Sequence, residues 1–529
     1  CILTGAVLLP MIALNVIPAF MSCSDFLDQN PDLRTTLDSE EKIANILVSA
    51  YISGAGSYQL VAELSSDNVC DYGITKNYNQ FYQDVYEWAE EVTSNNDAPR
   101  NYNNIANANQ ALSAIEELGG PTTTRLKASK GEALICRAYS HFVLANMFCM
   151  PYNPATAGNC LGIPYMDHAE TDLNPRYERG TLQEVYEMIG KDIEAGIPLI
   201  DDTAYSVPKY HFNYKAACCF ASRYYLFMQD WDNAIKYATM ALTSNPSSLL
   251  RDYSAIAALP NGTSRHQEYV NSASTANFLL QAATSNSGLL FDWYSTAGRY
   301  SHGKLQGIYE TVQPKKGGPW GSSVTFKAPH AVLASSGKYV LPRTWRVFQY
   351  TDPVAGTGFN KAISVLFTSE EALLNRAEAY IMKMNEDPTA LDKALEDINL
   401  YAANLFSAGF KSMTEASIIK WATETYPDYS ELYVGKTSVS SPQTLNPKKK
   451  LHAAPYNTLE EGGPQESMLQ ALIFMRRYQF LHEGMRWFDT RRFGITVYRY
   501  LLDEDAETVV QITDQISDEN GTADPRRAL

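Results

Sequence analysis

The sequence lacks the common motifs of catalytic and metal-binding sites. It has no H-E-x-x-H, G-x-G-x-x-G or G-x-S-x-G segment, so the local signatures of zinc proteases, dinucleotide-binding proteins and α/β-hydrolases are absent. Its eight cysteines include no C-x-x-C pair, which argues against a structural zinc site or a thioredoxin-like redox site. The eight histidines show no metal-ligand spacing. We therefore expect a binding protein without a cofactor or metal, and not an enzyme.

Positive charge is also scarce. The chain has 43 Lys and Arg against 59 Asp and Glu, a net charge of −16. Binding to nucleic-acid phosphates requires a basic surface, so nucleic acid is excluded as the default partner. A neutral or cationic ligand fits this composition better.

Long apolar runs are missing after residue 21. Residues 2–21 carry no charge and are about long enough to span a bilayer. They lead into Ser22-Cys23, and an apolar start that ends in a small residue before cysteine is typical of a secretory signal with a lipidation site. We expect a signal peptide over 1–22, an acyl (palmitate) anchor on Cys23 and a tether over 23–38. The alternative is an uncleaved anchor in which Cys23 is incidental.

The remainder, residues 39–529, is predicted to be one mainly helical domain. Apolar residues recur at i, i+3 and i+4 over approximately 39–56, 102–148, 181–243 and 369–406. Two helix–turn–helix pairs, 214–243 and 369–404, place small residues at close-packing positions and an aromatic residue before the turn. This pattern is typical of tetratricopeptide units, which must stack to bury their faces. The expected fold is a tetratricopeptide-like helical-repeat scaffold.

Two long stretches, approximately 57–100 and 246–365, break this helical pattern. They are rich in Gly, Ser, Asn, Pro and Tyr and contain only short alternating runs, so we expect large irregular loops with a few short strands. Loops of this length in a compact protein are usually functional. The chain also has 34 Tyr against 20 Phe and 7 Trp, and tyrosine combines a flat apolar ring with a polar tip. We therefore predict that these insertions bind the ligand.

Several segments occur in a characteristic order: Lys130-Gly-Glu-Ala-Leu-Ile-Cys-Arg-Ala-Tyr139, Gly162-Ile-Pro-Tyr165, Arg179-Gly-Thr-Leu-Gln-Glu-Val-Tyr186, Leu374-Asn-Arg-Ala-Glu-Ala-Tyr380 and His482-Glu-Gly-Met-Arg-Trp-Phe-Asp489, the last in a C-terminal signature region over 466–494. In these segments the sequence resembles the SusD-like (SusD/RagB) family, the glycan-binding surface lipoproteins of Bacteroidetes, over essentially its whole length. It departs from the family pattern at Met475, where the family usually has Glu, and at Pro99-Arg100-Asn101, where the family often has Trp.

The resemblance implies a SusD-like α-α superhelix and a non-catalytic glycan site made by the inserted loops. It implies a cell-surface lipoprotein of the outer membrane that captures an oligosaccharide or polysaccharide nutrient and delivers it to a SusC-like TonB-dependent transporter. An envelope glycoside hydrolase on a helical scaffold, or a peptide-binding member of the same family, is the alternative.

Candidate ligand residues follow from the chemistry of sugars. A sugar ring has apolar faces that stack on Trp or Tyr, and its hydroxyl groups exchange hydrogen bonds with Asn, Asp and Arg. Two loops supply such side chains: Asn68, Tyr72, Tyr78 and Trp88 in the first, and Asp292, Trp293, Tyr294, Arg299, Tyr300 and Trp320 in the second. Trp320 lies in a Pro-Trp-Gly turn, a context in which burial is difficult, so we expect it to be exposed.

Two further patterns predict structural roles. Arg486, Asp489 and Arg492 recur at i, i+3 and i+6, so their charges can pair along one helical face. We interpret this motif as structural and not as an active site. Cys149 and Cys160 flank a short loop and are candidates for a disulfide, which the sequence alone leaves open.

Overall fold

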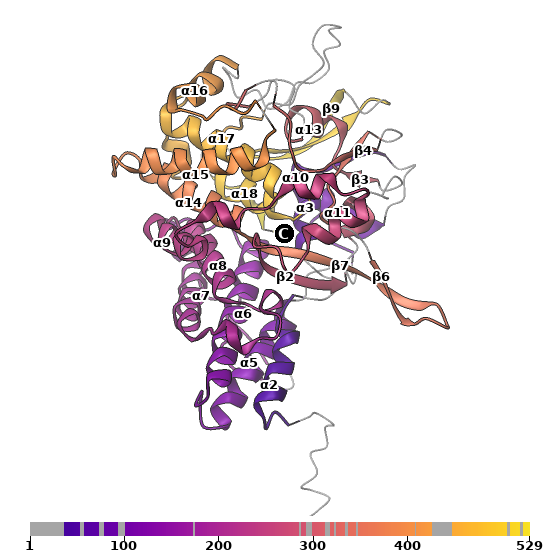
Figure 1. Cartoon of the computed structure of the whole chain (residues 1–529), viewed down its shortest axis with the longest axis vertical. Coiled ribbons are helices and arrows are strands. Elements are labelled where there is room, and N and C mark those ends of the chain that lie inside the picture. Colours follow the sequence, from indigo (N-terminus) through magenta and orange to yellow (C-terminus); the bar gives the residue numbers. More distant parts are fainter. Residues whose placement is uncertain are drawn as a thin grey trace, which may run out of the picture. The chain divides into compact units, whose positions relative to one another are not determined.

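The computed structural model describes residues 36–528 apart from 53–57, 74–78, 94–100, 173–174, 285–286, 292–298, 313–317, 322–323, 334–336, 345–346, 408, 426–446, 505–507 and 519–521. Residues from Asp38 onward form one compact unit, and its elements are drawn in Figure 1. No helix among the described residues is long and apolar enough to cross a membrane.

Antiparallel helices stack in the N-terminal half of this unit, as the periodicity predicts. Each helix packs on the next along the chain in the order α2, α5, α6 and α7, which lie side by side in Figure 1. Their bounds are Glu40–Leu47, Asn101–Glu117, Thr124–Phe148 and Leu182–Gly196. The predicted capping box is present at α7, where Thr181 and Glu184 bond reciprocally to each other's backbone N–H groups.

Both predicted helix–turn–helix pairs are confirmed. They are α8 with α9 and α14 with α15, and α14 packs on α9 and α8, so the two pairs join in one stack. Their bounds are Tyr214–Phe227, Trp231–Leu242, Ser369–Lys383 and Ala390–Leu405. Side chains of Asn213 and Asp230 accept hydrogen bonds from the first turns of α8 and α9, which fixes where each helix begins. The prediction of a mainly helical, tetratricopeptide-like fold is therefore confirmed.

The C-terminal signature region forms α17 (Pro464–Gln479) and α18 (Met485–Phe493), and α16 (Glu415–Lys420) packs on α17. Every residue of α18 is buried, including its charged ones. Asp489 pairs with Arg492 as predicted, at 2.9 Å between Oδ1 and Nε. Arg486 instead turns to Asp67, far away in sequence, through two bonds of 2.7 Å. The motif is thus a set of buried ion pairs that ties α18 to other segments, not a surface stripe.

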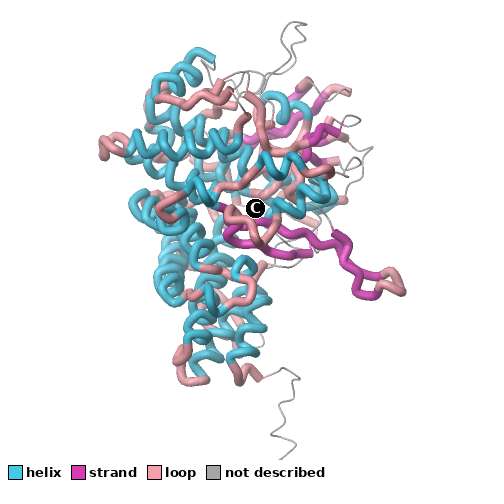
Figure 2. The backbone as a smooth tube through the Cα atoms, in the orientation of Figure 1, coloured by secondary structure: helices cyan, strands magenta, loops and turns pink. Residues whose placement is uncertain are grey.

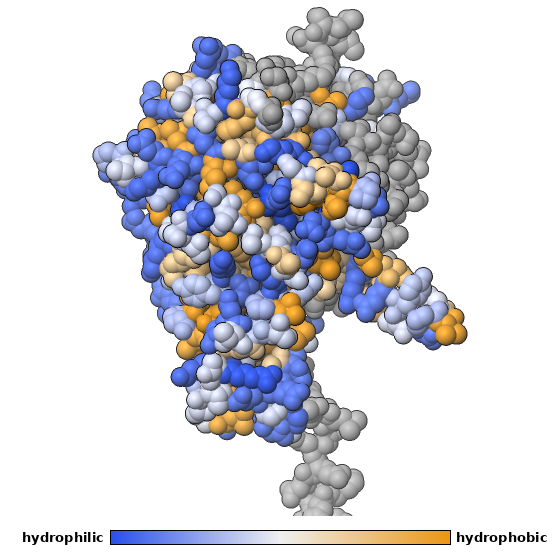
Figure 3. All heavy atoms as spheres, in the orientation of Figure 1, coloured by the Kyte–Doolittle hydropathy of each residue, from blue (hydrophilic) through white to orange (hydrophobic). Residues whose placement is uncertain are grey.

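Among the described residues the strands form four small antiparallel sheets, and strands appear in magenta in Figure 2. The largest has the order β2–β7–β6, and the others are the pairs β1–β3, β4–β5 and β8–β9. In chain order the bounds are Cys70–Asp71, Asn277–Thr284, Tyr300–Ser301, Ala331–Leu333, Lys338–Val340, Val347–Asp352, Thr357–Thr368, Val497–Leu502 and Val509–Ile516. The β6–β7 hairpin extends from the body, and hydrophobic residues lie at its tip in Figure 3, where Val354 is 99 % exposed.

The two stretches predicted as irregular loops contain more helix than expected. Short helices lie within both of them: α3 (Tyr58–Ser65), α4 (Gln80–Tyr86), α10 (Tyr253–Ala258), α11 (Gly262–Tyr269), α12 (Ser287–Phe291) and α13 (Lys304–Tyr309). Each is eight residues or shorter, so a periodic pattern has little length in which to show. Packing against the body, as of α3 on α18, stabilises helices that are too short to be stable alone.

Candidate functional site

Strand pairing between β1 and β3 joins the two loops predicted to bind the ligand. Cys70 lies opposite Ser301 and Asp71 opposite Tyr300. One residue further on, the backbone N–H of Tyr72 donates to the carbonyl of Arg299 at 2.8 Å. The strand pairing therefore brings together three candidate residues that are more than two hundred positions apart in the sequence: Tyr72 from the first loop, and Arg299 and Tyr300 from the second.

An ion pair fixes this junction. Arg299 donates to both carboxylate oxygens of Asp71, Nε to Oδ1 at 2.7 Å and Nη2 to Oδ2 at 2.6 Å, and also to Gln83 Oε1 at 3.2 Å. The hydrogen bonds to Asp71 raise the pKa of the Arg299 guanidinium above its ordinary value. Because its donors face Asp71 and Gln83, Arg299 holds the two strands together and does not present a free fork to a ligand.

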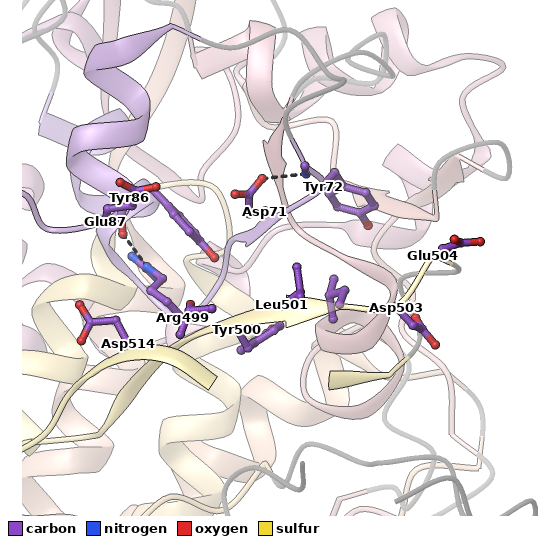
Figure 4. Close-up of a pocket in the computed structure, with 13 residues that line it drawn as sticks. Asp71, Tyr72, Tyr86, Glu87, Arg499, Tyr500, Leu501, Asp503, Glu504 and Asp514 are labelled. Carbon is purple, nitrogen blue, oxygen red and sulfur yellow. Dashed lines mark hydrogen bonds between the residues drawn. The ribbon is translucent and has the colours of Figure 1, made fainter. Parts of the chain in front are cut away.

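A cavity of about 470 Å³ opens beside β1 and is shown in Figure 4. Its walls come from β1, from the end of α4 and from the β8–β9 hairpin. The lining residues are Asp71, Tyr72, Gly73, Tyr86, Glu87, Arg499, Tyr500, Leu501, Leu502, Asp503, Glu504, Thr513 and Asp514. The lining thus combines tyrosine rings, aliphatic side chains and carboxylates.

Arg499 lines this cavity and has a structural role. It is 2 % exposed and donates to the carbonyls of Tyr86 at 2.5 Å, Ser66 and Leu64 at 2.9 Å and Ser65 at 3.0 Å. Its guanidinium carbon lies 4.0 Å from the ring centroids of both Tyr86 and Trp88. Burial lowers the pKa of the Arg499 guanidinium below its ordinary value. Arg499 therefore organises the wall instead of binding a ligand.

Tyr72 is the predicted aromatic residue that reaches the cavity. Its side chain is half-buried, its hydroxyl donates to the Gly337 carbonyl at 3.4 Å, and Lys338 Nζ lies 5.0 Å from its ring centroid. Tyr300 is fully buried and packs on Tyr86, with ring centroids 4.7 Å apart. Tyr72 is thus a candidate contact for a ligand, and Tyr300 supports the wall behind it.

Two predicted tryptophans are buried in the structure. Trp320 is 2 % exposed and stacks on Phe406 and Phe474 at centroid distances of 4.4 and 5.0 Å, so the expectation that its turn is hard to bury is wrong. Trp88 is 6 % exposed, and its Nε1 donates to the Ser65 carbonyl at 3.1 Å. In both cases neighbouring aromatic or cationic groups cover the large apolar ring, which the local sequence does not reveal.

Asn68 is likewise structural. It is fully buried, its Nδ2 donates to Glu63 Oε1 at 3.1 Å, and its Oδ1 accepts from Arg477 Nε at 2.9 Å. Its carbonyl lies 2.7 Å from His302 Nδ1. The amide is therefore satisfied by the protein and does not face a ligand.

The remaining predicted residues lie outside the described part of the chain. They are Tyr78, Asp292, Trp293, Tyr294 and the lipidation candidate Cys23. Cys149 and Cys160 are described, and both are free cysteines.

The sequence reasoning missed the β8–β9 hairpin, which supplies more than half of the cavity lining. In Figure 4, Arg499 and Leu501 extend from one face of β8 and Tyr500 from the other. Tyr500 packs with Cys70, Leu305, Tyr309 and Val509 below the cavity, and its hydroxyl accepts from Gln306 Nε2 at 2.7 Å. The segment Val-Tyr-Arg-Tyr-Leu-Leu over Val497–Leu502 contains a β-branched residue and two aromatic ones, and this composition favours a strand and could have indicated the element.

Two other features of the described residues bear on chemistry. No cluster of three or more His, Cys, Asp or Glu side chains there could hold a metal ion. A second cavity, of about 410 Å³, lies between α5 and the loop after Gly162; Tyr102, Ile105, Pro164, Met166 and Tyr177 contribute to its largely apolar lining.

Comparison with known families finds a match for the N-terminal part of the chain. Residues 25–226 match the SusD-like_3 family model, described as "Starch-binding associating with outer membrane". Over this segment the chain is similar to the SusD-like family. No curated protein matches the sequence.

Solved structures share the fold at low sequence identity. A SusD superfamily protein from Bacteroides vulgatus is 19 % identical over 90 % of this chain and 94 % of its own, with a TM-score of 0.57. A SusD superfamily protein from Bacteroides thetaiotaomicron is 18 % identical over 94 % of this chain and 96 % of its own, with a TM-score of 0.55. A SusD-like carbohydrate binding protein from Bacteroides vulgatus is 16 % identical over 93 % and 94 %, with a TM-score of 0.53.

Proposed function

We propose that this chain is a SusD-like protein that binds carbohydrate in the cavity between β1 and the β8–β9 hairpin. The observation that carries the proposal is the β1–β3 pairing, because it brings residues of both predicted ligand loops to the edge of one cavity. The match of residues 25–226 to a starch-binding family model supports the same ligand class.

The chemistry of the lining suits a sugar. The half-buried ring of Tyr72 offers a flat surface for the C–H face of a pyranose, and Leu501, 55 % exposed, adds apolar surface across the cavity. Carboxylates around the rim, including Glu87 and Glu504, accept hydrogen bonds from sugar hydroxyl groups. A few such contacts on an open surface correspond to dissociation constants of roughly micromolar to millimolar.

We further propose that binding is non-catalytic and serves nutrient capture. In this proposal Cys23 carries the lipid that anchors the chain at the outer-membrane surface, and a SusC-like TonB-dependent transporter receives the glycan. The family model's description, which joins starch binding to association with the outer membrane, supports this arrangement. Co-purification of a barrel transporter with the tagged chain from membranes, lost with Cys23→Ala, tests anchoring and partnership together.

A glycoside hydrolase is the second candidate, because the cavity contains several carboxylates and such enzymes use a pair of them. Two of these carboxylates form ion pairs with arginines: Asp71 pairs with Arg299, and Asp514 Oδ2 lies 2.8 Å from Arg526 Nη1. Fixed ion pairs of this kind favour a structural role over proton transfer. A peptide ligand is the remaining alternative within the family.

The test is an affinity-gel screen of the purified full chain against plant, host and microbial polysaccharides, with reducing-sugar release measured in the same samples. The variant Tyr72→Ala removes the ring at the cavity. Tyr350→Ala, which removes a 57 % exposed ring from β6 outside the cavity, is the matched control. Loss of one stacking contact is worth about 1 kcal/mol, so Tyr72→Ala should weaken binding roughly five- to tenfold.

Retardation by a polysaccharide that weakens with Tyr72→Ala but not with Tyr350→Ala, without sugar release, supports the proposal. Sugar release favours the hydrolase. Equal retardation of all three proteins places the ligand elsewhere, and no retardation by any polymer refutes polysaccharide binding and leaves short oligosaccharides and peptides.

A further inference from the structure

We infer that the cavity selects uncharged glycans and discriminates against glycans that carry carboxylate or sulfate groups. This inference rests on the proposed carbohydrate-binding function and adds the substrate class. It follows from the balance of charge around the cavity and from how its cationic groups are used.

Acidic groups dominate the lining. Asp71, Glu87, Asp503, Glu504 and Asp514 all border the cavity, and Figure 4 shows them distributed around it instead of gathered at one point. Arg499 is the one cationic side chain among the described lining residues. A ligand therefore meets carboxylate oxygens, which accept hydrogen bonds from hydroxyl groups but repel negatively charged substituents.

The described cations near the cavity are buried or already bonded to the protein. Arg499 is buried and donates to backbone carbonyls of α3 and α4. Arg299 lies behind Asp71, and Arg526 is shared between Asp514 and Asp524. Recognition of a uronate or sulfate uses an accessible guanidinium or ammonium group. Arg299 and Arg499 offer none because they are buried, and Arg526, with a side chain 38 % exposed, already donates to Asp514, Asp524 and the Gln515 carbonyl. Lys338, whose Nζ lies 5.0 Å from the Tyr72 ring centroid, is fully buried.

The charge difference sets the size of the effect. Together with Asp524, which shares Arg526, the five lining carboxylates make six acidic groups. They face four described cations, Arg299, Arg499, Arg526 and Lys338, so the excess is two negative charges. At separations of about 6–8 Å in water, two like charges weaken the binding of each anionic substituent by roughly tenfold at low ionic strength. Because the Debye length is about 10 Å at 0.1 M salt and about 3 Å at 1 M, high salt should remove most of this difference.

The test compares matched ligands and matched variants. The probes are soluble starch with carboxymethyl starch, and methyl-esterified with de-esterified homogalacturonan, each titrated at low and high salt. The variant Glu87→Gln/Glu504→Gln removes two charges from the cavity rim. The control Glu187→Gln/Glu386→Gln makes the same change in net charge on exposed residues of α7 and the α14–α15 turn. Glu187 matches Glu87 closely, since each accepts a bond of 2.9 Å from a Gln four residues earlier.

We expect the neutral probe of a pair to bind roughly tenfold more tightly than its charged partner at low salt. This ratio should fall to within about threefold in high salt and in Glu87→Gln/Glu504→Gln, and stay unchanged in the control. Equal binding of neutral and charged probes, with both weakened in Tyr72→Ala, overturns the charge inference but leaves carbohydrate binding intact. A ratio that changes equally in both double variants also overturns it, since net charge would then be responsible. If none of the wider polysaccharide panel binds, the proposed function and this inference fail together.

Discussion

Replacing Asp489 by Asn should destabilise the protein severely, although the two side chains have nearly the same shape. Asp489 lies in α18 with 1 % exposure and accepts from Arg476 Nε at 3.0 Å and Nη2 at 3.1 Å, and from Arg492 Nε at 2.9 Å. Arg476 also donates to Asn375 Oδ1, and Arg492 to both carboxylate oxygens of Glu378. The substitution leaves two buried guanidinium groups with Glu378 as the remaining carboxylate near both.

The cost is large because the charges left behind are buried. Removing one partner of a buried ion pair costs about 3–5 kcal/mol, whereas an exposed pair is worth about 0–1 kcal/mol. The matched control is Glu461→Gln, which removes the carboxylate that Lys450 contacts at 2.8 Å, with both side chains about half exposed. We therefore expect a loss of at least about 3 kcal/mol in the free energy of unfolding for Asp489→Asn and less than about 1 kcal/mol for Glu461→Gln.

Urea unfolding of the three proteins at neutral pH, followed by tryptophan fluorescence and circular dichroism together, measures this difference. An Asp489→Asn variant that unfolds within about 1 kcal/mol of the wild type would refute the reasoning. Acid provides a second measurement. Burial by itself would raise the pKa of Asp489, but Arg476 and Arg492 outweigh it and hold that pKa below its ordinary value. The stabilisation is therefore present above about pH 4 and is lost as the pH falls further, and Asp489→Asn should lack this part of the acid transition.

Two further predictions concern Glu63 and Trp320. Burial raises the pKa of Glu63 to about 7, so the folded protein keeps a proton that the unfolded chain releases above about pH 4.3. Its contribution to the free energy of unfolding thus falls as the pH rises to about 7. Urea titrations should show that the free energy of unfolding decreases less between about pH 5 and pH 8 in Glu63→Gln than in the wild type. Equal decreases in the two proteins would contradict this. Trp320→Ala should lower the free energy of unfolding by about 3–5 kcal/mol, because it leaves a cavity beside Phe406 and Phe474. The folded fraction should keep its glycan affinity. A loss of affinity without destabilisation would place Trp320 at the ligand instead.

Much of the helical scaffold is predictable because the signals lie close together in sequence. The small residues and the Gln229-Asp230 turn between α8 and α9 predict a packed pair, and that pair is present. The capping box at Thr181 spans three residues and begins α7. Such interactions are made within one or two helical turns, so the local sequence contains all the groups that form them.

The C-terminal signature is an intermediate case. Its structural role and the Asp489–Arg492 pair follow from the i, i+3 spacing. The partner of Arg486 does not, because Asp67 comes from the turn after α3, more than four hundred residues earlier. A helical spacing shows which side chains can meet along a helix, but not which distant segment packs against it.

The candidate site divides in the same way. The sequence by itself determined that the chain is a helical-repeat protein and that two polar, tyrosine-rich insertions interrupt it, and it predicted Tyr72 as a ligand residue. Only the tertiary structure decided that β1 pairs with β3, that the β8–β9 hairpin completes the cavity, and that Trp320, Trp88 and Asn68 are buried. The physical reason is that helix formation depends on neighbours three or four residues apart, whereas exposure of a loop side chain depends on which distant segments cover it.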